Sequence, residues 1–257
     1  MILLIDIGNT NTHLGLADAK RVVRQANIPT AAWFAGRAGK RVASFLRGKT
    51  IEAAALCSVV PAATRFAHAF CREQLKVECF ELTNQSVRDL GIDYPKPETI
   101  GPDRLANALA AKHFFGAPSV VVDFGTAVTF DVVDAKGNYV GGIIAPGLAA
   151  MTDYLHEKTA LLPKIKIREV RAVIGKNTRE AMLIGAVHGY RGLVRELIEG
   201  LKRKLKCEAV PVVATGGYAK LMARNLPEIA SVDPLLTLHG LRLFAQAQAR
   251  QKIGSSH

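Results

Sequence analysis

The sequence lacks long apolar runs and paired cysteine motifs, and both absences narrow the possibilities. No run of about 18 consecutive apolar residues occurs, so we expect no membrane-spanning helix and no membrane partner. The acidic Asp6 comes too early for the N-terminal apolar segment to be a signal peptide. The 4 cysteines show neither CxxC spacing nor the nearby histidines of a zinc site. We therefore predict a protein of the reducing cytoplasm, without a disulfide scaffold.

Several common nucleotide-binding and catalytic motifs are missing as well. The sequence contains no GxxxxGK[ST] and no GxGxxG, so neither a P-loop nor a dinucleotide-binding Rossmann fold is supported. A GxSxG nucleophile elbow and the paired HRD and DFG motifs of protein kinases are also missing. If the protein binds a nucleotide, it must therefore use a different sequence motif.

Aromatic residues are scarce, which bears on the meaning of the positive charge. The 34 lysines and arginines exceed the 22 acidic residues, giving a formal net charge of +12, while aromatics make up 6% of the chain. The basic clusters at 37–41, 164–168 and 202–206 contain no aromatic residue on which a base could stack. We do not expect nucleic acid as a partner. Solvated surfaces and attraction for anionic metabolites both remain open.

The chain does contain ample core material for a two-domain α/β protein. Of its 257 residues, 49% are hydrophobic, and short apolar runs alternate with segments of helical periodicity. We expect strands at 1–7, 11–16, 53–60, 77–82, 119–133, 139–144 and 211–215. We expect helices at 30–47, 62–75, 103–115, 178–206 and 235–250.

One pattern occurs twice. Residues 3–10 and 120–127 each form an apolar run that ends in Asp-x-Gly, carried by Asp6 and Asp123, followed by small polar residues. Glycine lets the backbone approach phosphate oxygens, and a carboxylate can hold a hydrated cation that neutralises them. The repetition predicts two similarly folded lobes, residues 1–115 and 116–257, that share a cleft for a nucleoside triphosphate. The 215–217 Thr-Gly-Gly at a strand end fits the same interpretation.

With these motifs the chain resembles the superfamily of actin, Hsp70 and sugar kinases, and within it type III pantothenate kinase. The matching stretches are 6–12, 58–61, 101–107, 123–129, 141–147, 174–178, 215–217 and 236–241. The resemblance implies an α/β fold of duplicated actin-like (ribonuclease H-like) lobes, each a mixed sheet flanked by helices, with an ATP cleft between them. It also implies ATP-dependent phosphorylation of pantothenate, the first step of coenzyme A synthesis, by a cytoplasmic homodimer that needs Mg²⁺ and K⁺ or NH₄⁺.

The resemblance assigns expected roles to individual residues. Asp103 corresponds to the general base, Asp123 to the ligand of the monovalent cation, and Asp6 to a residue near Mg²⁺, directly or through water. The expected ATP-binding residues are Asp6, Ile7, Gly8, Asn9, Thr10, Asn11, Thr12, His13 and Thr126. The expected pantothenate-binding residues are Tyr94, Gly101, Pro102, Asp103, Arg104 and Thr178. The dimer can bring Thr178 from the partner subunit, and the family commonly has another small residue where this chain has Pro102.

The residues themselves agree with these roles but leave alternatives open. A carboxylate such as Asp103 can take the proton of a primary alcohol, yet it can also be an ordinary acid at a helix start. Arg104 can form a bidentate pair with the pantothenate carboxylate, or it can be a solvated cation. Tyr94 can simply pack, and Thr178 can simply begin a helix.

The helical glycines Gly185, Gly189 and Gly192 predict a close helix approach, because each costs about 1 kcal/mol relative to alanine. A subunit interface and a crossing within the chain are both compatible with them. Two other functions stay open: a regulatory or accessory protein with the same fold, and another small-molecule kinase of the superfamily.

Overall fold

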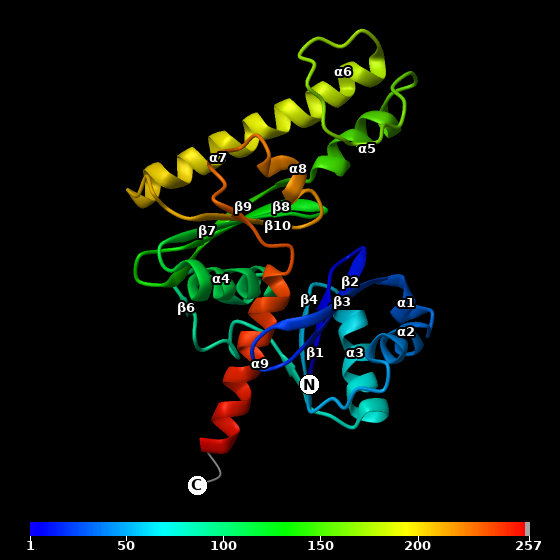
Figure 1. Cartoon of the computed structure of the whole chain (residues 1–257), viewed down its shortest axis with the longest axis vertical. Helices are drawn as coiled ribbons and strands as arrows, with labels where there is room; N and C mark the ends of the chain where they lie inside the picture. The colour runs from blue at the N-terminus through cyan, green and yellow to red at the C-terminus, as the bar shows by residue number, and fades with distance from the viewer. Residues whose placement is uncertain (255–257) are drawn as a thin grey trace. The chain divides into compact units, whose positions relative to one another are not determined.

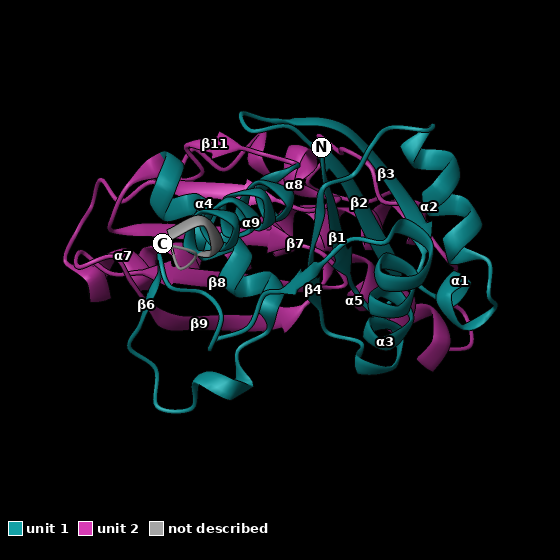
Figure 2. Ribbon diagram, turned by 90° about the horizontal axis from the view of Figure 1, so that it is seen from below, with its two compact units in different colours: residues 1–114, 235–257 teal, residues 115–234 magenta. Residues whose placement is uncertain are grey.

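The computed structural model describes residues 1–254, and the chain forms two compact units (Figures 1 and 2). Unit 1 contains Met1–Phe114 together with the C-terminal segment from Leu235, and unit 2 contains Phe115–Pro234. Among the described residues, no helix combines the length and apolar character needed to cross a bilayer.

Unit 1 is built on a five-stranded mixed sheet in the order β3-β2-β1-β4-β5. The central strand β1 pairs antiparallel with β2 and parallel with β4. The outer strand β3 pairs antiparallel with β2, and the outer strand β5 pairs parallel with β4. The strands are β1 (Ile2–Ile7), β2 (Asn11–Ala17), β3 (Val22–Pro29), β4 (Ala53–Ser58) and β5 (Cys79–Glu81), and a short β6 (Gly91–Ile92) follows in sequence.

One face of this sheet is covered by the helices α1 (Ala31–Phe34), α2 (Ala38–Leu46) and α3 (Pro61–Phe70), the last continued by a π-helical turn, η1 (Cys71–Leu75). Leu3, Ile5 and Ile7 alternate along β1 toward this core and are fully buried. Each such side chain contributes roughly 1.5–3 kcal/mol through burial. The predicted single helix at 30–47 is interrupted at Gly36, whose φ of 64° is left-handed.

The other face of the unit 1 sheet is covered by the C-terminal helix α9 (Leu236–Gly254), which contacts β1, β2, β3 and β4. A Cβ on Gly15 would lie 3.2 Å from both Leu238 and Leu4, so the glycine allows α9 close to the sheet. The predicted second lobe, 116–257, therefore differs from the observed units at its end. Helix α9 buries its apolar side chains on the first sheet, although it comes last in the chain.

Unit 2 repeats this strand arrangement. The strands β7 (Ser119–Phe124), β8 (Ala127–Val133), β9 (Asn138–Pro146), β10 (Val212–Thr215) and β11 (Ser231–Val232) are ordered β9-β8-β7-β10-β11. As in unit 1, the first three are antiparallel and the last two continue in parallel. The segment 119–133, expected as one strand, is a hairpin that turns at Gly125 and Thr126.

The helices of unit 2 are α5 (Leu148–Lys158), α6 (Thr178–Ile184), α7 (Tyr190–Leu205) and α8 (Ala219–Ala223), with a π-helical segment, η3 (Gly185–Gly189), between α6 and α7. Phe124, Phe130 and Val194 lie in the core between the sheet and these helices. Because the two sheets share strand order and directions, the repeat seen in the sequence is a repeat of the fold. Unit 1 also contains the 3₁₀ turn η2 (Pro97–Thr99) and helix α4 (Pro102–Phe115).

Candidate active site

The strand aspartate of unit 1, Asp6, lies between side chains from both neighbouring strands. The sheet register pairs Asp6 with His13 on β2 and with Cys57 on β4, so the three side chains share one face. The Cys57 thiol donates a hydrogen bond to Asp6 Oδ1 at 3.3 Å. His13 Nδ1 lies 3.9 Å from the other oxygen, Oδ2. Cys57 is fully buried, whereas the His13 side chain is 46% exposed, so the row runs from the interior to the surface.

Burial and a second carboxylate make ionisation of Asp6 unfavourable. Burial, and after it the charge of Asp103, raises the pKa of Asp6 from 3.8 to about 7, against the opposing hydrogen bond from Cys57. Burial also raises the pKa of the Cys57 thiol well above its usual range. A cation next to Asp6 would remove much of this penalty, because opposite charge favours the ionised carboxylate.

Asp103 lies at the beginning of α4, one residue after the helix-starting Pro102. Its Oδ1 accepts a hydrogen bond from the backbone N–H of Arg104 at 2.9 Å. Burial raises the pKa of Asp103, while the hydrogen bond and charge of Arg104 oppose the shift. A Cβ on Gly101 would lie 2.5 Å from Asp103 Oδ1. Only glycine therefore lets this carboxylate fold back over residue 101.

Helix α4 is held in place by α9. The Thr237 hydroxyl donates to Asn107 Oδ1 at 2.8 Å, across 130 residues of sequence. A Cβ on Gly240 would collide with the carbonyl oxygen of Ala106, so the two helices cross at that glycine. Because α9 also packs on the sheet that carries Asp6, it fixes the helix of Asp103 relative to the strand of Asp6. Figure 1 shows α4 and α9 crossing.

The turn between β1 and β2 presents small polar side chains. The Gly8 N–H donates to the Asn11 carbonyl at 3.0 Å, and the Thr30 hydroxyl donates to the Gly8 carbonyl at 2.7 Å. Asn9, Thr10 and Asn11 are exposed beyond these bonds. The tip of the hairpin is therefore both fixed and open to a ligand.

Two residues of the expected ATP segment instead point into the core. Ile7 and Thr12 are fully buried. Trp33 Nε1 donates to the Thr12 hydroxyl at 3.1 Å, and the Thr30 hydroxyl lies at the same distance of 3.1 Å from it. These two side chains support the hairpin, so only their backbone groups are available to a nucleotide. Strand alternation explains the difference, since neighbouring side chains face opposite sides.

In unit 2, Asp123 occupies the position that Asp6 has in unit 1. The register pairs Asp123 with Thr129 on β8 and with Thr215 on β10. Gly216 adopts a left-handed φ of 89°, and a Cβ there would lie 2.5 Å from Asp123 Oδ1. The Gly216 backbone is therefore packed directly against this carboxylate.

Thr126 is exposed at the β7–β8 turn, which corresponds to the hairpin of unit 1. The Gly147 N–H donates to the Thr126 carbonyl at 3.1 Å, and a Cβ on Gly147 would collide with the same oxygen. The Ala-Pro-Gly end of β9 thus closes around the turn that carries Thr126.

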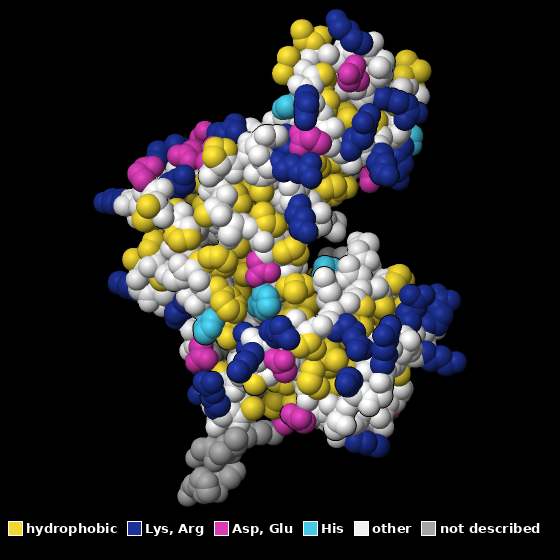
Figure 3. Space-filling model, viewed as in Figure 1, with side chains coloured by type: hydrophobic (Ala, Val, Ile, Leu, Met, Phe, Trp, Pro, Cys, Tyr) yellow, Lys and Arg dark blue, Asp and Glu magenta, His cyan; other side chains and the backbone are white. Residues whose placement is uncertain are grey.

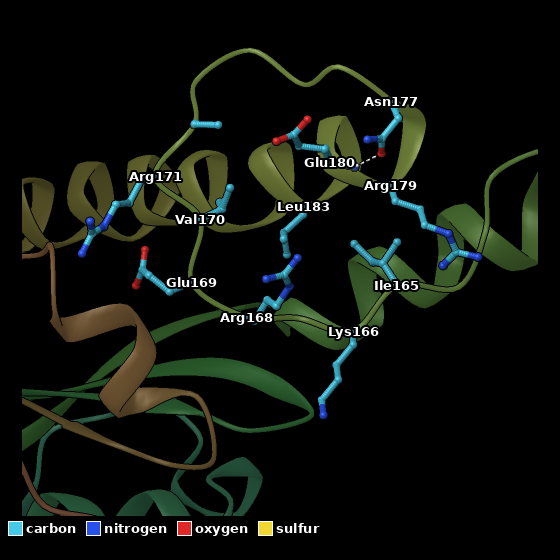
Figure 4. A pocket seen from close by; sticks show the side chains of 11 residues that line it. Ile165, Lys166, Arg168, Glu169, Val170, Arg171, Asn177, Arg179, Glu180 and Leu183 are labelled. Carbon is cyan, nitrogen blue, oxygen red and sulfur yellow. Dashed lines mark hydrogen bonds between the residues drawn. The ribbon is translucent and has the colours of Figure 1, made fainter.

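The remaining predicted residues lie on exposed segments of separate units. Tyr94, in the loop before η2 of unit 1, is 36% exposed. Thr178 begins α6 of unit 2, directly after the cap residue Asn177, whose side chain accepts from the Glu180 N–H at 2.9 Å. Figure 4 shows this cap at the edge of a cavity of about 550 Å³, into which Arg168 points.

Several residues that shape the site were not predicted as parts of it. Cys57 is an ordinary residue of an apolar run in the sequence, and only the strand register places it beside Asp6. Asn107, Thr237 and Gly240 fall within the matching stretches, but their pairing across the chain carries no local signal.

The comparisons of the sequence with known families and proteins agree on one family. A model of the family described as type III pantothenate kinase matches residues 2–200. A type III pantothenate kinase of Akkermansia muciniphila is 47% identical over 244 residues, which cover 95% of this chain and 97% of the relative. One from Methylacidiphilum infernorum is 42% identical over 252 residues, with 98% and 90% covered.

Solved structures support the fold. A Campylobacter jejuni protein, described as a Baf family transcriptional activator, aligns at a TM-score of 0.61 and 19% identity, over 96% of this chain and 99% of that one. The ROK hexokinase of Thermus thermophilus aligns at a TM-score of 0.52 and 16% identity, with 97% and 99% covered. At such identities the likeness shows the fold alone, and it confirms the predicted actin-like class. On the sequence matches across nearly its whole length, the chain belongs to the type III pantothenate kinase family.

Proposed function

We propose that Asp103 is the general base of the reaction of this family, the ATP-dependent phosphorylation of pantothenate that opens coenzyme A biosynthesis. The single observation that carries the proposal is the placement of Asp103. Asp103 is the second residue of α4, its Oδ1 accepts a hydrogen bond from the Arg104 backbone N–H at 2.9 Å, and burial raises its pKa. A raised pKa makes a carboxylate a stronger base toward an alcohol proton, provided that it remains ionised at working pH.

Asp6 is proposed to act next to the divalent cation that accompanies ATP, which we take to be Mg²⁺. Within the described part of the chain, no group of three or more His, Cys, Asp or Glu side chains forms a metal cage. Mg²⁺ fits such a site, because it commonly relies on one or two carboxylates plus substrate phosphates. The ion would neutralise phosphate charge when bound. The exposed Asn9, Thr10 and Asn11 and the backbone of the turn are available to the phosphates.

Pantothenate is proposed to bind at the segment that leads into α4. Arg104 can pair with the substrate carboxylate through two parallel hydrogen bonds. Gly101 and Pro102 shape the turn beneath it, and Tyr94 supplies a ring from the preceding loop. This arrangement leaves Asp103 free to receive the hydroxyl end of the substrate.

In unit 2, we propose that Asp123 binds the monovalent cation, K⁺ or NH₄⁺, and that Thr126 contacts ATP. The support is positional, since Asp123 is the counterpart of Asp6 and its carboxylate lies against the Gly216 backbone.

A homodimer is proposed from an exposed apolar surface of unit 2. Tyr154 and Leu155 on α5 are 61% and 41% exposed, and Val173 and Ile174 before α6 are 77% and 70% exposed. Hydrophobic side chains are visible on this part of unit 2 in Figure 3. A contiguous apolar surface usually marks an interaction site, and we propose these four side chains as the contact. The dimer would also bring Thr178 to a partner's substrate.

The glycine stripe of η3 and α7 fits the same interface. A Cβ on Gly185, Gly189 or Gly192 would meet no atom within 4 Å, so the alternative of a tight crossing within the chain finds no support among the described residues. We also place the enzyme in the cytoplasm, where ATP and reduced cysteines are available.

The alternative of a regulatory protein is not favoured. Asp6, Asp103, Arg104 and Asp123 are all present, and the likeness to a Baf family transcriptional activator extends to the fold only.

The proposed substrate assignment can be tested with purified protein, Mg-ATP and a panel of acceptors, with the products identified by mass. Pantothenate should be phosphorylated, and the analogue whose carboxylate is reduced to an alcohol should be a poor substrate. Arg104→Ala should lose this discrimination, since a charge-assisted pair contributes about 1.5–3 kcal/mol. If Arg104→Ala still prefers pantothenate as strongly as the parent enzyme, the Arg104 role is wrong.

A further inference from the structure

The environment of Asp6 contains a buried hydrogen-bond donor that the proposed mechanism does not use. Cys57 Sγ lies 3.3 Å from Asp6 Oδ1, and the Cys57 residue has no exposed surface. The other oxygen, Oδ2, is the one that lies 3.9 Å from His13, on the more exposed side. The two oxygens of one carboxylate therefore have different surroundings, because two different strands supply their neighbours.

We propose that Cys57 is a positioning residue for Asp6, whose thiol holds Oδ1 and thereby directs Oδ2 toward the Mg-ATP complex. The inference rests on the proposed role of Asp6 and extends it by one residue. A carboxylate can rotate about its Cα–Cβ and Cβ–Cγ bonds, and a fixed partner on one oxygen restricts that rotation before the ligand arrives. Preorganisation of this kind strengthens binding, because the ordering is already complete.

A simpler interpretation is that Cys57 fills space as a small apolar residue, which is common for buried cysteines. Cys71 of the same unit has different surroundings: it is fully buried in the hydrophobic core between the sheet and α1–α3, and its thiol is partnered by Cys79 and not by a carboxylate. Cys57 lies on the other face of the sheet, in the row with Asp6 and His13. An apolar side chain there would leave Oδ1 without its buried donor, which is unfavourable.

Unit 2 uses a similar side chain at the matching place. Thr215 is paired with Asp123 as Cys57 is paired with Asp6, and it is 2% exposed. Both positions thus carry a short side chain that can donate a hydrogen bond from the neighbouring parallel strand. An exchange of sulfur for oxygen should therefore preserve the function of Cys57, whereas loss of the donor should not.

The test compares Cys57→Ala with Cys57→Ser, two variants of nearly equal size that differ by one hydroxyl. Cys57→Ala should raise the KM for Mg-ATP by roughly three- to tenfold, as expected for the loss of one ordinary hydrogen bond, because a thiol is a weak donor. The KM for pantothenate should change by less than about twofold, and Cys57→Ser should restore the KM for Mg-ATP. Cys71→Ala is the matched control, since it shortens a buried cysteine without touching Asp6; it should lower the melting temperature and leave both KM values unchanged.

A binding experiment separates this inference from the role of Asp6 itself. The Kd of Mg-ATP is measured by calorimetry for Asp6→Ala, Cys57→Ala and the double variant. If Cys57 acts through Asp6, Cys57→Ala should weaken binding in the parent enzyme and have no further effect in Asp6→Ala. An unchanged Kd in Asp6→Ala would overturn the proposed role of Asp6. A raised Kd in Asp6→Ala, together with equal Kd values for Cys57→Ala and Cys57→Ser, would overturn the Cys57 inference alone.

Discussion

The two units share a sheet but differ in what surrounds their strand aspartates. In unit 1, Asp6 is flanked by the imidazole of His13 and the thiol of Cys57. In unit 2, Asp123 is flanked by the hydroxyls of Thr129 and Thr215. The order and directions of the five strands of each unit are otherwise equivalent. A duplicated backbone can therefore keep a carboxylate in place while its neighbours change its chemistry.

The two aspartates also differ in the groups that approach them from outside the sheet. Unit 1 brings the charge of Asp103 near Asp6 through α4, and this second acid contributes to the raised pKa of Asp6. In unit 2, a glycine backbone is packed against Asp123 instead. Under the proposed roles, unit 1 carries the reacting groups and the phosphate-binding turn, whereas unit 2 carries the monovalent cation and one further contact with ATP.

The largest expected effect is a loss of turnover when the proposed base of unit 1, Asp103, is replaced. Asp103→Asn keeps the size of the side chain but removes the base, so kcat should fall by about 10²–10⁴-fold. The KM for ATP should change little, because we propose that the phosphates bind at the turn between β1 and β2. The comparison between units would break if Asp103→Asn kept parental turnover while folded, which circular dichroism can check. Glu98→Gln, an exposed acid in the preceding turn, serves as the neutral control.

A second effect concerns stability without bound metal. The pKa of Asp6 is about 7 in the folded state and 3.8 ordinarily, so the folded protein binds the proton more tightly. The contribution of Asp6 to the free energy of unfolding is therefore most favourable at low pH. It decreases as the pH rises from about 4 to about 7, and it stays unfavourable above that range. Asp6→Asn should raise the free energy of unfolding at pH 8 by an amount on the order of 2–4 kcal/mol, and should have little effect near pH 4.

Denaturant titrations in EDTA at both pH values measure this difference. Asp18 offers a control of opposite sign, because backbone N–H groups of Arg21 and then Lys20 lower its pKa. Asp18→Asn should lose a little stability at neutral pH and none well below pH 4. If Asp6→Asn and the parent protein had the same free energy of unfolding at pH 8, the folded structure would not disfavour the ionised Asp6 carboxylate.

The smallest expected effect compares Gly8, which follows β1 in unit 1, with Gly216, which follows β10 in unit 2. Gly216 has a φ of 89° and no space for a Cβ, so Gly216→Ala should destabilise the protein by about 1–3 kcal/mol. At Gly8 the nearest atom to a Cβ is the Asn11 carbonyl oxygen at 3.1 Å, and φ is not left-handed. Gly8→Ala should therefore lose less than about 1 kcal/mol. Thermal unfolding of both variants measures the difference, and equal losses would contradict the distinct roles of the two backbones.

Much of the fold could be predicted because its signals are local. Apolar runs mark the central strands, and Asp-x-Gly marks the end of β1 and of β7, where each strand turns back on itself. The inward side chains of Ile7 and Thr12 were missed, because a motif specifies a segment while strand alternation decides which residues face the ligand. The break at Gly36 was missed because helical periodicity continues on both sides of it.

The sequence by itself determined the duplicated α/β architecture, the two strand aspartates and the Gly-x-Asp-Arg segment, since each depends on neighbouring residues and on backbone geometry. Only the tertiary structure decided that α9 packs on the first sheet and that Thr237 and Gly240 hold α4 in place. It also decided that Cys57 lies beside Asp6. These contacts join residues that are from 51 (Asp6 and Cys57) to 223 (Gly15 and Leu238) positions apart, where burial and strand register, rather than local preference, select the partners.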